Sequence, residues 1–191
     1  MSSTIEQKKD KLRNKFLMRR KQVGSDRREE MSRRITAHIV DWEIYLQAKT
    51  VHCFISIDKQ MEIDTWPLIQ KMAEDRKRIV VPRAIVDDTR LEHLLFRPGD
   101  PLEENKWGIP EPVQRRRVPV SELDLIFVPA VSIDRKKNRL GYGKGFYDRF
   151  LSEASACKAG LLFEDCVSES ILPVEEHDEQ LDAVVTEKSI F

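Results

Sequence analysis

Polar residues dominate the first forty positions, and the thin apolar stripes among them predict two helices. The first runs from about residue 3 to residue 22, where Ser3 and Glu6 have the spacing of a capping box. Gly24 ends it and Ser25 caps the second helix, whose apolar residues recur at helical intervals and are Met31, Ile35, Ile39 and Trp42. The pattern therefore predicts a helix with a thin apolar stripe followed by an amphipathic one.

From residue 50 onward the pattern changes to short runs rich in β-branched and aromatic residues, which predict strands. These runs are residues 50–57, 78–85, 91–97, 124–133, 158–163 and 182–187. Helices are predicted at 62–75, capped by Asp64 or Thr65, and at 146–154. This alternation predicts an α/β fold with a mostly parallel central sheet flanked by helices, and with the very apolar run 124–133 at its centre.

The segment 98–120 interrupts the alternation of strands and helices. It is rich in proline and longer than an ordinary connection between elements. Loops of this length are typically functional, so we expect this one to contribute to a site.

The composition describes a globular protein with a highly charged surface, because 40% of the 191 residues are hydrophobic and 35% are charged. One domain, residues 1–191, can bury a sizeable core at this length without disulfides or metals. Cys53, Cys157 and Cys166 lack the CxxC spacing, which favours reduced thiols. There is no run long enough to span a membrane and no signal-peptide core, so we expect a cytoplasmic protein.

Charge is balanced overall but unevenly distributed along the chain. Residues 1–34 hold twelve Lys or Arg and five acidic residues, whereas residues 164–191 hold nine acidic residues and one Lys. The basic end suits nucleic acid, a membrane surface or an anionic small ligand, and it also suits pairing with the acidic end. We favour pairing plus one or two ligand contacts, because Phe16 is the one aromatic residue available there for stacking on nucleic acid.

Three of the seven glycines fall within residues 139–148, RLGYGKGFYD, between a predicted strand and a predicted helix. Backbone amides freed by glycine, beside a helix amino terminus, form a nest for anions. Arg139 and Lys144 would bring positive charge to phosphate oxygens, and Asp148 in the first helical turn would hold a divalent ion. The segment predicts a nucleotide-phosphate site, with a structural turn or a hinge as alternatives.

The spacing of these glycines matches no common nucleotide motif. A P-loop requires GxxxxGK[ST] and the dinucleotide fingerprint requires GxGxxG, whereas this segment has GxGxG. Tyr142, between two glycines, is poorly placed for a core, while Tyr147 can be a core residue and Phe146 suits packing. Spacing alone therefore leaves the alternatives open.

Segments along most of the chain resemble those of the 5-formyltetrahydrofolate cyclo-ligases, also called methenyltetrahydrofolate synthetases. They are KDKLR (9–13), EIDT (62–65), VPR (81–83), WGIPEP (107–112), DLIFVPAVSID (124–134), NRLGYGKGFYDRFL (138–151) and LPVEEHDEQLDAVVTE (172–187). Their number and order make chance similarity improbable. The resemblance implies a three-layer Rossmann-like fold of the kind found in sugar-phosphate isomerases and CoA transferases.

The resemblance implies an ATP- and Mg²⁺-dependent cyclisation of the reduced folate 5-formyltetrahydrofolate to 5,10-methenyltetrahydrofolate, with release of ADP and phosphate. The formyl oxygen attacks the γ-phosphate, N10 then attacks the activated formyl carbon, and phosphate leaves. Such phosphoryl transfer needs mainly positioning and charge neutralisation. We accordingly expect a small-molecule substrate, no nucleic-acid or membrane partner, and a monomer.

The family's ATP and metal contacts map onto both ends of the chain. Lys9 and Arg13 match the amino-terminal ATP contacts, and Arg13 also lies near the substrate in the family. Positions that match the phosphate loop are Arg139, Gly141, Gly143, Lys144, Gly145 and Tyr147, with Lys144 and Arg139 as the catalytic pair. Asp148 and Asp178 match the magnesium-linked acids.

Folate contacts of the family match Ile55 and Glu62, and Trp107 resembles a wall of the pterin site. Residues that border the same pocket are Arg13, Tyr142, Lys144 and Phe146. Simpler interpretations stay open: Glu62 can flank the helix near Asp64, Ile55 can be a core residue, and Asp178 can belong to a solvated acidic run.

Four positions depart from the family pattern. Ala130 replaces a usual glycine, Ile133 a frequent phenylalanine, Phe146 a common tyrosine and Cys166 a frequent glutamine. None of these changes removes a charge needed for phosphate transfer, so we expect activity to persist.

Two other functions fit the sequence less well. A phosphosugar isomerase of the same fold would use the glycine nest for a monophosphate and would not need ATP. A non-catalytic nucleotide- or folate-binding module would use the basic amino-terminal arm to contact RNA.

Overall fold

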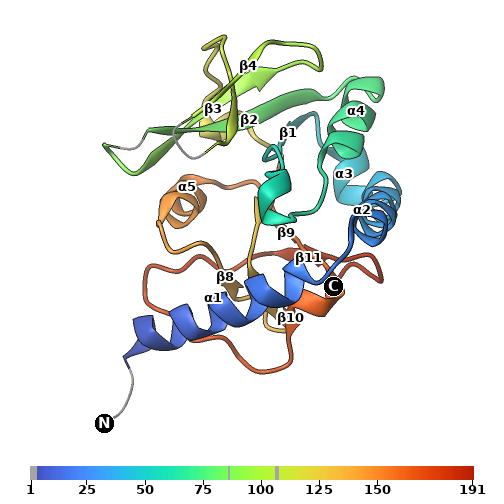
Figure 1. Cartoon of the computed structure of the whole chain (residues 1–191). Helices are drawn as coiled ribbons and strands as arrows, with labels where there is room; N and C mark the ends of the chain where they lie inside the picture. The colour runs from blue at the N-terminus through green and yellow to red at the C-terminus, as the bar shows by residue number, and fades with distance from the viewer. Residues whose placement is uncertain (1–3, 86, 106–107) are drawn as a thin grey trace.

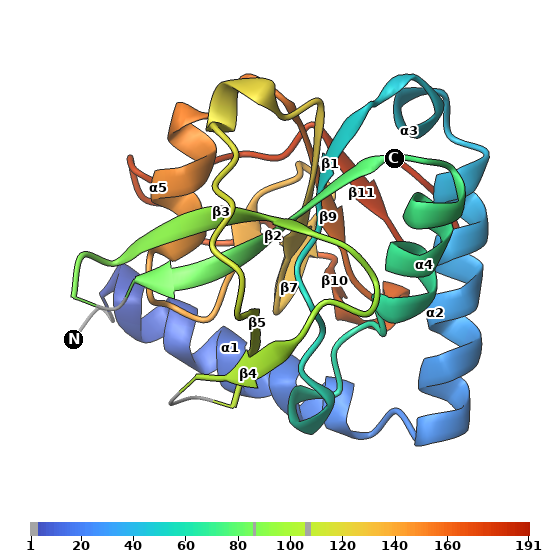
Figure 2. The ribbon, with the colours of Figure 1, turned by 90° about the horizontal axis from the view of Figure 1, so that it is seen from above.

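The computed structural model describes residues 4–85, 87–105 and 108–191. Its main sheet has six strands in the order β11-β9-β6-β1-β2-β3 (Figures 1 and 2), and all neighbours are parallel except β2 and β3. The strands are β1 (Thr50–His52), β2 (Arg78–Ile85), β3 (Arg90–Phe96), β6 (Leu125–Pro129), β9 (Cys157–Leu161) and β11 (Ala183–Val185). The predicted mostly parallel sheet is confirmed, with β6 and β1 at its centre.

Helices cover both faces of this sheet, which makes the predicted three layers. On β6, Leu125 and Phe127 point to a core that also contains residues of α2 (Ser25–Val40) and α4 (Trp66–Glu74). Ile126 and Val128 point to the opposite core, with residues of α1 (Ile5–Lys21) and α5 (Phe146–Glu153). Figure 2 shows the sheet between α5 on one side and α2, α4 and the short α3 (Glu43–Gln47) on the other.

Two small sheets and three short 3₁₀ helices complete the fold of the described residues. One sheet has the order β10-β7-β8 and the other is an antiparallel pair within the proline-rich segment. Their strands are β7 (Ser132–Asp134), β8 (Arg139–Leu140), β10 (Val167–Ser168), β4 (Leu102–Glu104) and β5 (Pro110–Pro112), and the 3₁₀ helices are η1 (Asp58–Gln60), η2 (Val120–Glu122) and η3 (Glu164–Cys166). No helix among the described residues is long and apolar enough to cross a membrane.

The predicted strands 158–163 and 182–187 end early, at Leu161 and Val185, and two other predicted strands differ more from the sequence pattern. The run 124–133 is divided between β6 and β7, because the Ala130 carbonyl accepts a bond from Arg20 and the Val131 amide donates to Leu140. The glycine segment consequently follows the short strand β8 and not the central strand.

The run 50–57 forms a strand only as far as His52. Beyond it, the Thr65 hydroxyl donates to the Phe54 carbonyl at 2.9 Å and accepts from the Ser56 amide at 3.0 Å. These bonds to a side chain replace the ladder bonds that would continue the strand, so residues 53–57 form a loop at the end of β1.

The helix boundaries differ from the predicted ones by a few residues. Thr4 caps α1 and forms the capping box with Gln7, while Ser3 lies outside the described residues. Ser25 is the first residue of α2, and Gly24 occupies its cap position. Helix α2 ends before Trp42, which precedes α3. The helix predicted at 62–75 begins only at Trp66, but its predicted capping residues are confirmed, because Thr65 occupies the cap position and the Asp64 carboxylate accepts from the Trp66 amide.

Candidate functional site

A cavity of about 400 Å³ lies at the carboxyl ends of the central strands. Phe54 and Ile55, in the loop that follows β1, line it together with Pro129 at the end of β6. From β1 the chain continues to β2 on one side of the sheet, and from β6 it continues to β9 on the opposite side. The direction in which strands are added therefore reverses between β1 and β6. Open α/β sheets bind their ligands at this kind of position.

The cavity brings together most of the residues that the sequence predicted for a site. Those that line it are Ile55, Glu62, Arg139, Gly141, Tyr142, Gly143, Lys144, Gly145, Phe146, Tyr147 and Asp148. Among the described residues, Lys9, Arg13 and Asp178 lie outside this lining. Trp107 lies outside the described residues, so its predicted place in the pterin site stays a prediction.

Arg139 and Asp148 face each other across the start of α5. A guanidinium nitrogen of Arg139 lies 2.5 Å from a carboxylate oxygen of Asp148, and both side chains are largely buried. The Arg139 guanidinium also lies 5.8 Å from the ring centre of Tyr147, while its Nε is buried with no hydrogen-bond partner among the described residues. The two predicted ligands of phosphate and metal are thus paired with each other.

The glycine loop, residues 141–145, allows two guanidinium groups to approach the backbone closely. A Cβ on Gly141 would lie 2.6 Å from a nitrogen of Arg139, and one on Gly143 would lie 2.9 Å from Cζ of Arg13. Arg13 also donates to the Gly141 carbonyl at 3.0 Å. The loop therefore collects positive charge from α1 as well as from β8, and Lys144 adds a third, exposed cation at the cavity.

Glu62 is a buried carboxylate in the cavity wall. Its Oε1 accepts from the Tyr142 hydroxyl at 2.5 Å and its Oε2 accepts from the Ile57 amide at 2.9 Å. Burial raises the pKa of Glu62, while the bond from Tyr142 and the charges of Arg20 and Arg28 oppose that rise. Asp64, and not Glu62, bonds the start of α4, so Glu62 does not cap that helix.

Lys9 is buried on α1 and forms ion pairs with two acids of the loop between β10 and β11. Its Nζ lies 2.7 Å from Glu175 and 2.5 Å from Asp178. Burial lowers the pKa of Lys9, but the hydrogen bonds and charges of these acids outweigh it, and the pKa ends above its usual value. The basic amino terminus and the acidic carboxyl-terminal region are therefore in direct contact, as the charge distribution suggested.

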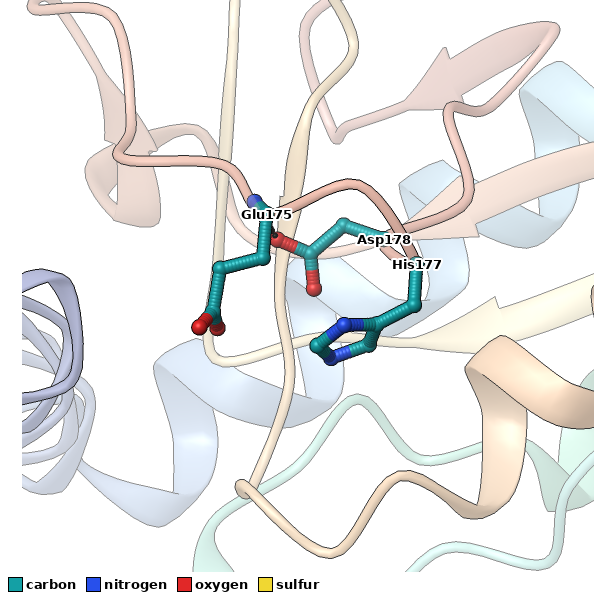
Figure 3. A group of neighbouring side chains, drawn as sticks. All are labelled: Glu175, His177 and Asp178. Atoms are coloured by element: carbon teal, nitrogen blue, oxygen red, sulfur yellow. Dashed lines mark hydrogen bonds between the residues drawn. The ribbon is translucent and has the colours of Figure 1, made fainter.

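Figure 3 shows Glu175, His177 and Asp178 on this loop, and their ligand atoms all lie within 4.8 Å of one another. Asp148 does not belong to this group, which is the one set of acidic and histidine side chains with metal-compatible spacing among the described residues. The structure thus separates the two predicted magnesium acids into two ion pairs, Arg139–Asp148 and Lys9–Asp178.

Several residues of the site were not predicted from the sequence. Further lining residues are Phe54, Ile57, Gln60, Pro82, Ala84, Leu91, Ile109, Pro110, Glu111 and Pro129. Three of them, Ile109, Pro110 and Glu111, come from the proline-rich segment, and Glu111 accepts from the Ala84 amide at 3.0 Å. The unusual length of that segment was the signal that could have identified them. The buried Arg20 was also missed, although it follows Phe16 by one helical turn on the buried side of α1.

The lining of the cavity combines two kinds of surface. The Glu62 carboxylate and apolar side chains such as Ile55 and Ile57 form one, and the glycine loop with its cations forms the other. A flat, partly apolar molecule that donates hydrogen bonds suits the first surface, and phosphate oxygens suit the second. One cavity can therefore hold both kinds of group.

Comparison with known proteins gives a consistent result. A sequence model of the 5-formyltetrahydrofolate cyclo-ligase family matches residues 5–187. The 5-formyltetrahydrofolate cyclo-ligase of Escherichia coli (strain K12) is 33% identical over 180 residues, which cover 91% of this chain and 97% of that protein. The mouse enzyme of the same name is 27% identical, with 97% of each chain covered.

Solved structures agree with the sequence comparison. The NMR structure of Aquifex aeolicus 5,10-methenyltetrahydrofolate synthetase superimposes with a TM-score of 0.83 at 30% identity, covering 95% of this chain and 91% of that one. A 5,10-methenyltetrahydrofolate synthetase from Mycoplasma pneumoniae has a TM-score of 0.73 at 19% identity, covering 94% and 98%, and shares the fold.

Proposed function

The chain belongs to the 5-formyltetrahydrofolate cyclo-ligase family of ligases, and from this premise we propose that it catalyses the ATP- and Mg²⁺-dependent cyclisation of 5-formyltetrahydrofolate. The products are 5,10-methenyltetrahydrofolate, ADP and phosphate. The observation that carries the proposal is that one cavity is lined both by Glu62 with apolar side chains and by a glycine loop with cations. The reaction needs both kinds of surface, one for the folate and one for the phosphate that is transferred.

The surface with Glu62 and apolar side chains supports recognition of a pterin ring. Glu62 offers carboxylate oxygens to N–H donors of the ring, and Ile55 provides an apolar contact for one of its faces. Phe146 and Tyr142, which border the same cavity from the glycine loop, bring the formyl group close to the cations. Proximity of this kind is a major part of the rate enhancement in two-substrate reactions.

The surface with the glycine loop and its cations supports binding of ATP. The buried Arg139 Nε has no partner among the described residues, which fits an anion placed beside it. Lys144 and Arg139 would stabilise the charge on the transferred phosphoryl group, with Gly145 and Tyr147 shaping the loop. Arg13 and Lys9 would contact the nucleotide from α1, and Arg13 also reaches the Gly141 carbonyl on the cavity side.

The carboxylates of Asp148 and Asp178 are ligands of the kind that Mg²⁺ prefers. Bound Mg²⁺ would neutralise phosphate charge. Each carboxylate is already paired with a cation, Arg139 or Lys9, that is also assigned to ATP. Binding of ATP together with Mg²⁺ would exchange these partners. The two carboxylates would then bind the metal, and the two cations would bind the phosphates.

The test combines the protein with 5-formyltetrahydrofolate and Mg-ATP and follows methenyl absorbance together with ADP. We expect one ADP per methenyl product and no product when ATP, Mg²⁺ or folate is omitted. Product formation without ATP, or ADP release without a methenyl species, would contradict the proposal. A phosphosugar isomerase would show neither signal. A cytoplasmic, monomeric enzyme remains part of the proposal, and sedimentation analysis tests the monomer.

A further inference from the structure

We propose that Arg20 is a positioning residue, which acts through Tyr142 to hold Glu62 and the glycine loop in the arrangement that forms one wall of the cavity. The inference rests on the proposed function, because Glu62 and Tyr142 are there assigned to the folate. Arg20 itself lies outside the cavity lining among the described residues. Arg20 therefore acts on a ligand in this cavity through the residues that it holds and through its charge, and not by contact.

The guanidinium of Arg20 is buried and contacts two segments beyond its own helix. It donates to the Tyr142 hydroxyl at 2.6 Å and to the Ala130 carbonyl at 3.2 Å. It also lies 5.6 Å from the centre of the Tyr142 ring. Within the described part of the chain it forms no ion pair, although a buried charge is costly without an opposite charge nearby.

The Tyr142 hydroxyl connects the Arg20 guanidinium to a negative charge, the Glu62 carboxylate. Tyr142 accepts the bond from Arg20 and donates its own proton to Glu62 Oε1 at 2.5 Å. Because a tyrosine hydroxyl has a single proton, it donates that proton to the carboxylate while its oxygen accepts from the cation. Arg20, Tyr142 and Glu62 thus form a chain of charge-assisted hydrogen bonds, in which each bond polarises the next.

This chain joins three separate parts of the fold. Arg20 comes from α1, Tyr142 from the glycine loop and Glu62 from the segment between η1 and α4. Tyr142 is 37% exposed, yet both sides of its hydroxyl are bonded inside the protein. Without Arg20, Tyr142 would keep only the bond to Glu62, and the glycine loop would lose its link to α1 at this point.

Arg20 also influences the ionisation of Glu62. The charged and titratable groups that face Glu62 are Arg20 from α1, Arg28 from α2, Tyr142 from the glycine loop and Tyr147 from α5. Arg28 donates to the main-chain carbonyl of Glu62 and pairs with Asp58. Arg20 and Arg28 both lower the pKa of the buried carboxyl group, so removing Arg20 raises it. A protonated Glu62 loses one of its acceptor sites for the ligand.

The experiment compares Arg20→Met with Arg19→Met. Arg19 is the exposed neighbour on the same helix, and it bonds the Asp165 carbonyl. Carbon-13 NMR of labelled glutamate side chains follows the titration of Glu62, and fluorescence quenching follows 5-formyltetrahydrofolate binding across pH. For Arg20→Met we expect the Glu62 titration to move to higher pH and the affinity at pH 7 to fall about tenfold. For Arg19→Met we expect neither change.

A double-variant cycle tests whether the effect passes through Tyr142. In a Tyr142→Phe background, Arg20→Met should weaken folate binding by less than about threefold, because the link is already broken. An equal loss of affinity in both backgrounds would mean that Arg20 acts independently of Tyr142 and would overturn the proposal. If Arg20→Met does not fold, Arg20→Lys replaces it in the binding cycle, since it loses the fork that reaches both partners. Lysine keeps the charge, so the Glu62 titration should then stay unchanged while folate binding weakens.

The outcomes separate this inference from the proposed function. The Glu62 titration requires no folate and no turnover, so it reports on Arg20 even if the wild-type protein forms no methenyl product. Turnover by the wild type combined with an unchanged Glu62 titration in Arg20→Met would overturn the inference and leave the function intact.

Discussion

The ammonium group of Lys9 lies 2.5 Å from a carboxylate oxygen of Asp178, in a contact that joins α1 to the loop between β10 and β11. Glu175 shares the same ammonium at 2.7 Å, and only 6% of the Lys9 side chain is exposed. One buried cation therefore offsets the repulsion between two carboxylates, and the three groups together keep one negative charge. A divalent ion at Asp178 would take over this task from Lys9.

Lys9→Met should make stability depend on magnesium. The variant leaves Glu175 and Asp178 without their cation, which should lower the free energy of unfolding by about 3 kcal/mol without metal. Mg²⁺ should restore part of that loss in the variant and have little effect on the wild type. Urea unfolding with and without MgCl₂ measures both. The control is Lys8→Met, at an exposed neighbouring position, and an identical magnesium response in all three proteins would contradict the exchange of partners.

Asp148→Asn should raise the magnesium concentration needed for half-maximal activity. The amide lacks the charge that holds a divalent ion, and it also leaves the Arg139 guanidinium without its ion pair. The measurement is a magnesium titration of the initial rate at saturating ATP. Glu153→Gln, an exposed change on the same helix, should behave as the wild type. An unchanged titration for Asp148→Asn would remove this residue from the metal site.

Lys144→Ala should lower kcat/KM for ATP about 100-fold while the folded protein stays stable. The side chain is exposed at the cavity, so its loss removes a phosphate contact and little packing. Initial rates as a function of ATP and a thermal unfolding curve test the two parts separately. Lys136→Ala, at another exposed position outside the cavity lining, is the control. A Lys144→Ala protein that loses activity only because it unfolds would count against the ligand role.

Gly143→Ala should weaken ATP binding through a contact with Arg13, in addition to the backbone strain that it introduces. The residue has φ +82°, and its added Cβ would lie 2.9 Å from Cζ of Arg13, so the guanidinium must move. Gly99→Ala provides a matched control, because Gly99 also has a positive φ of +96° but no atom within 4 Å of the added Cβ. Both variants should lose about 1 kcal/mol of stability, and only Gly143→Ala should raise the KM for ATP. Equal KM values would show that Arg13 is not needed at the loop.

The sequence predicted the layers of the fold well because hydrophobic alternation is a local property. The β2 strand matches its predicted run from Arg78 to Ile85, and β6 carries core side chains on both faces as its apolar run required. The ends of elements were less predictable where a distant side chain decides them. Thr65 ends β1, and Arg20 helps to end β6, and neither contact is encoded near the strand that it ends.

In the site, too, local patterns could be predicted and contacts between distant residues could not. The glycine loop and Glu62 belong to segments with a recognisable pattern, and they do line one cavity. The pairing of Lys9 with Asp178, and of Arg139 with Asp148, depends on how charged residues share space in three dimensions. A sequence motif assigns each of these residues a ligand but carries no information about its partner in the absence of that ligand.

Two histidines, His52 and His93, are buried in a cluster with Phe150. The ring centres of His52 and His93 lie 5.2 Å apart, and both pack against Phe150. Neither ring nitrogen of His52 has a hydrogen-bond partner among the described residues. Burial lowers the pKa of His52 well below its usual value and lowers the pKa of His93 to about 4. Both rings are therefore neutral in the folded protein at pH 7.

This cluster should make the protein acid-sensitive below pH 6.5. The unfolded chain binds protons on these histidines near pH 6.5, whereas the folded protein does not. Their contribution to the free energy of unfolding is therefore fully present above that pH and is lost as the pH decreases. The loss from His93 alone approaches about 3 kcal/mol at its folded pKa of about 4. Urea unfolding between pH 7 and pH 4.5 should show a shallower decline for His93→Leu. The exposed change His177→Gln should keep the wild-type slope, and equal slopes in all three proteins would assign the acid sensitivity to other groups.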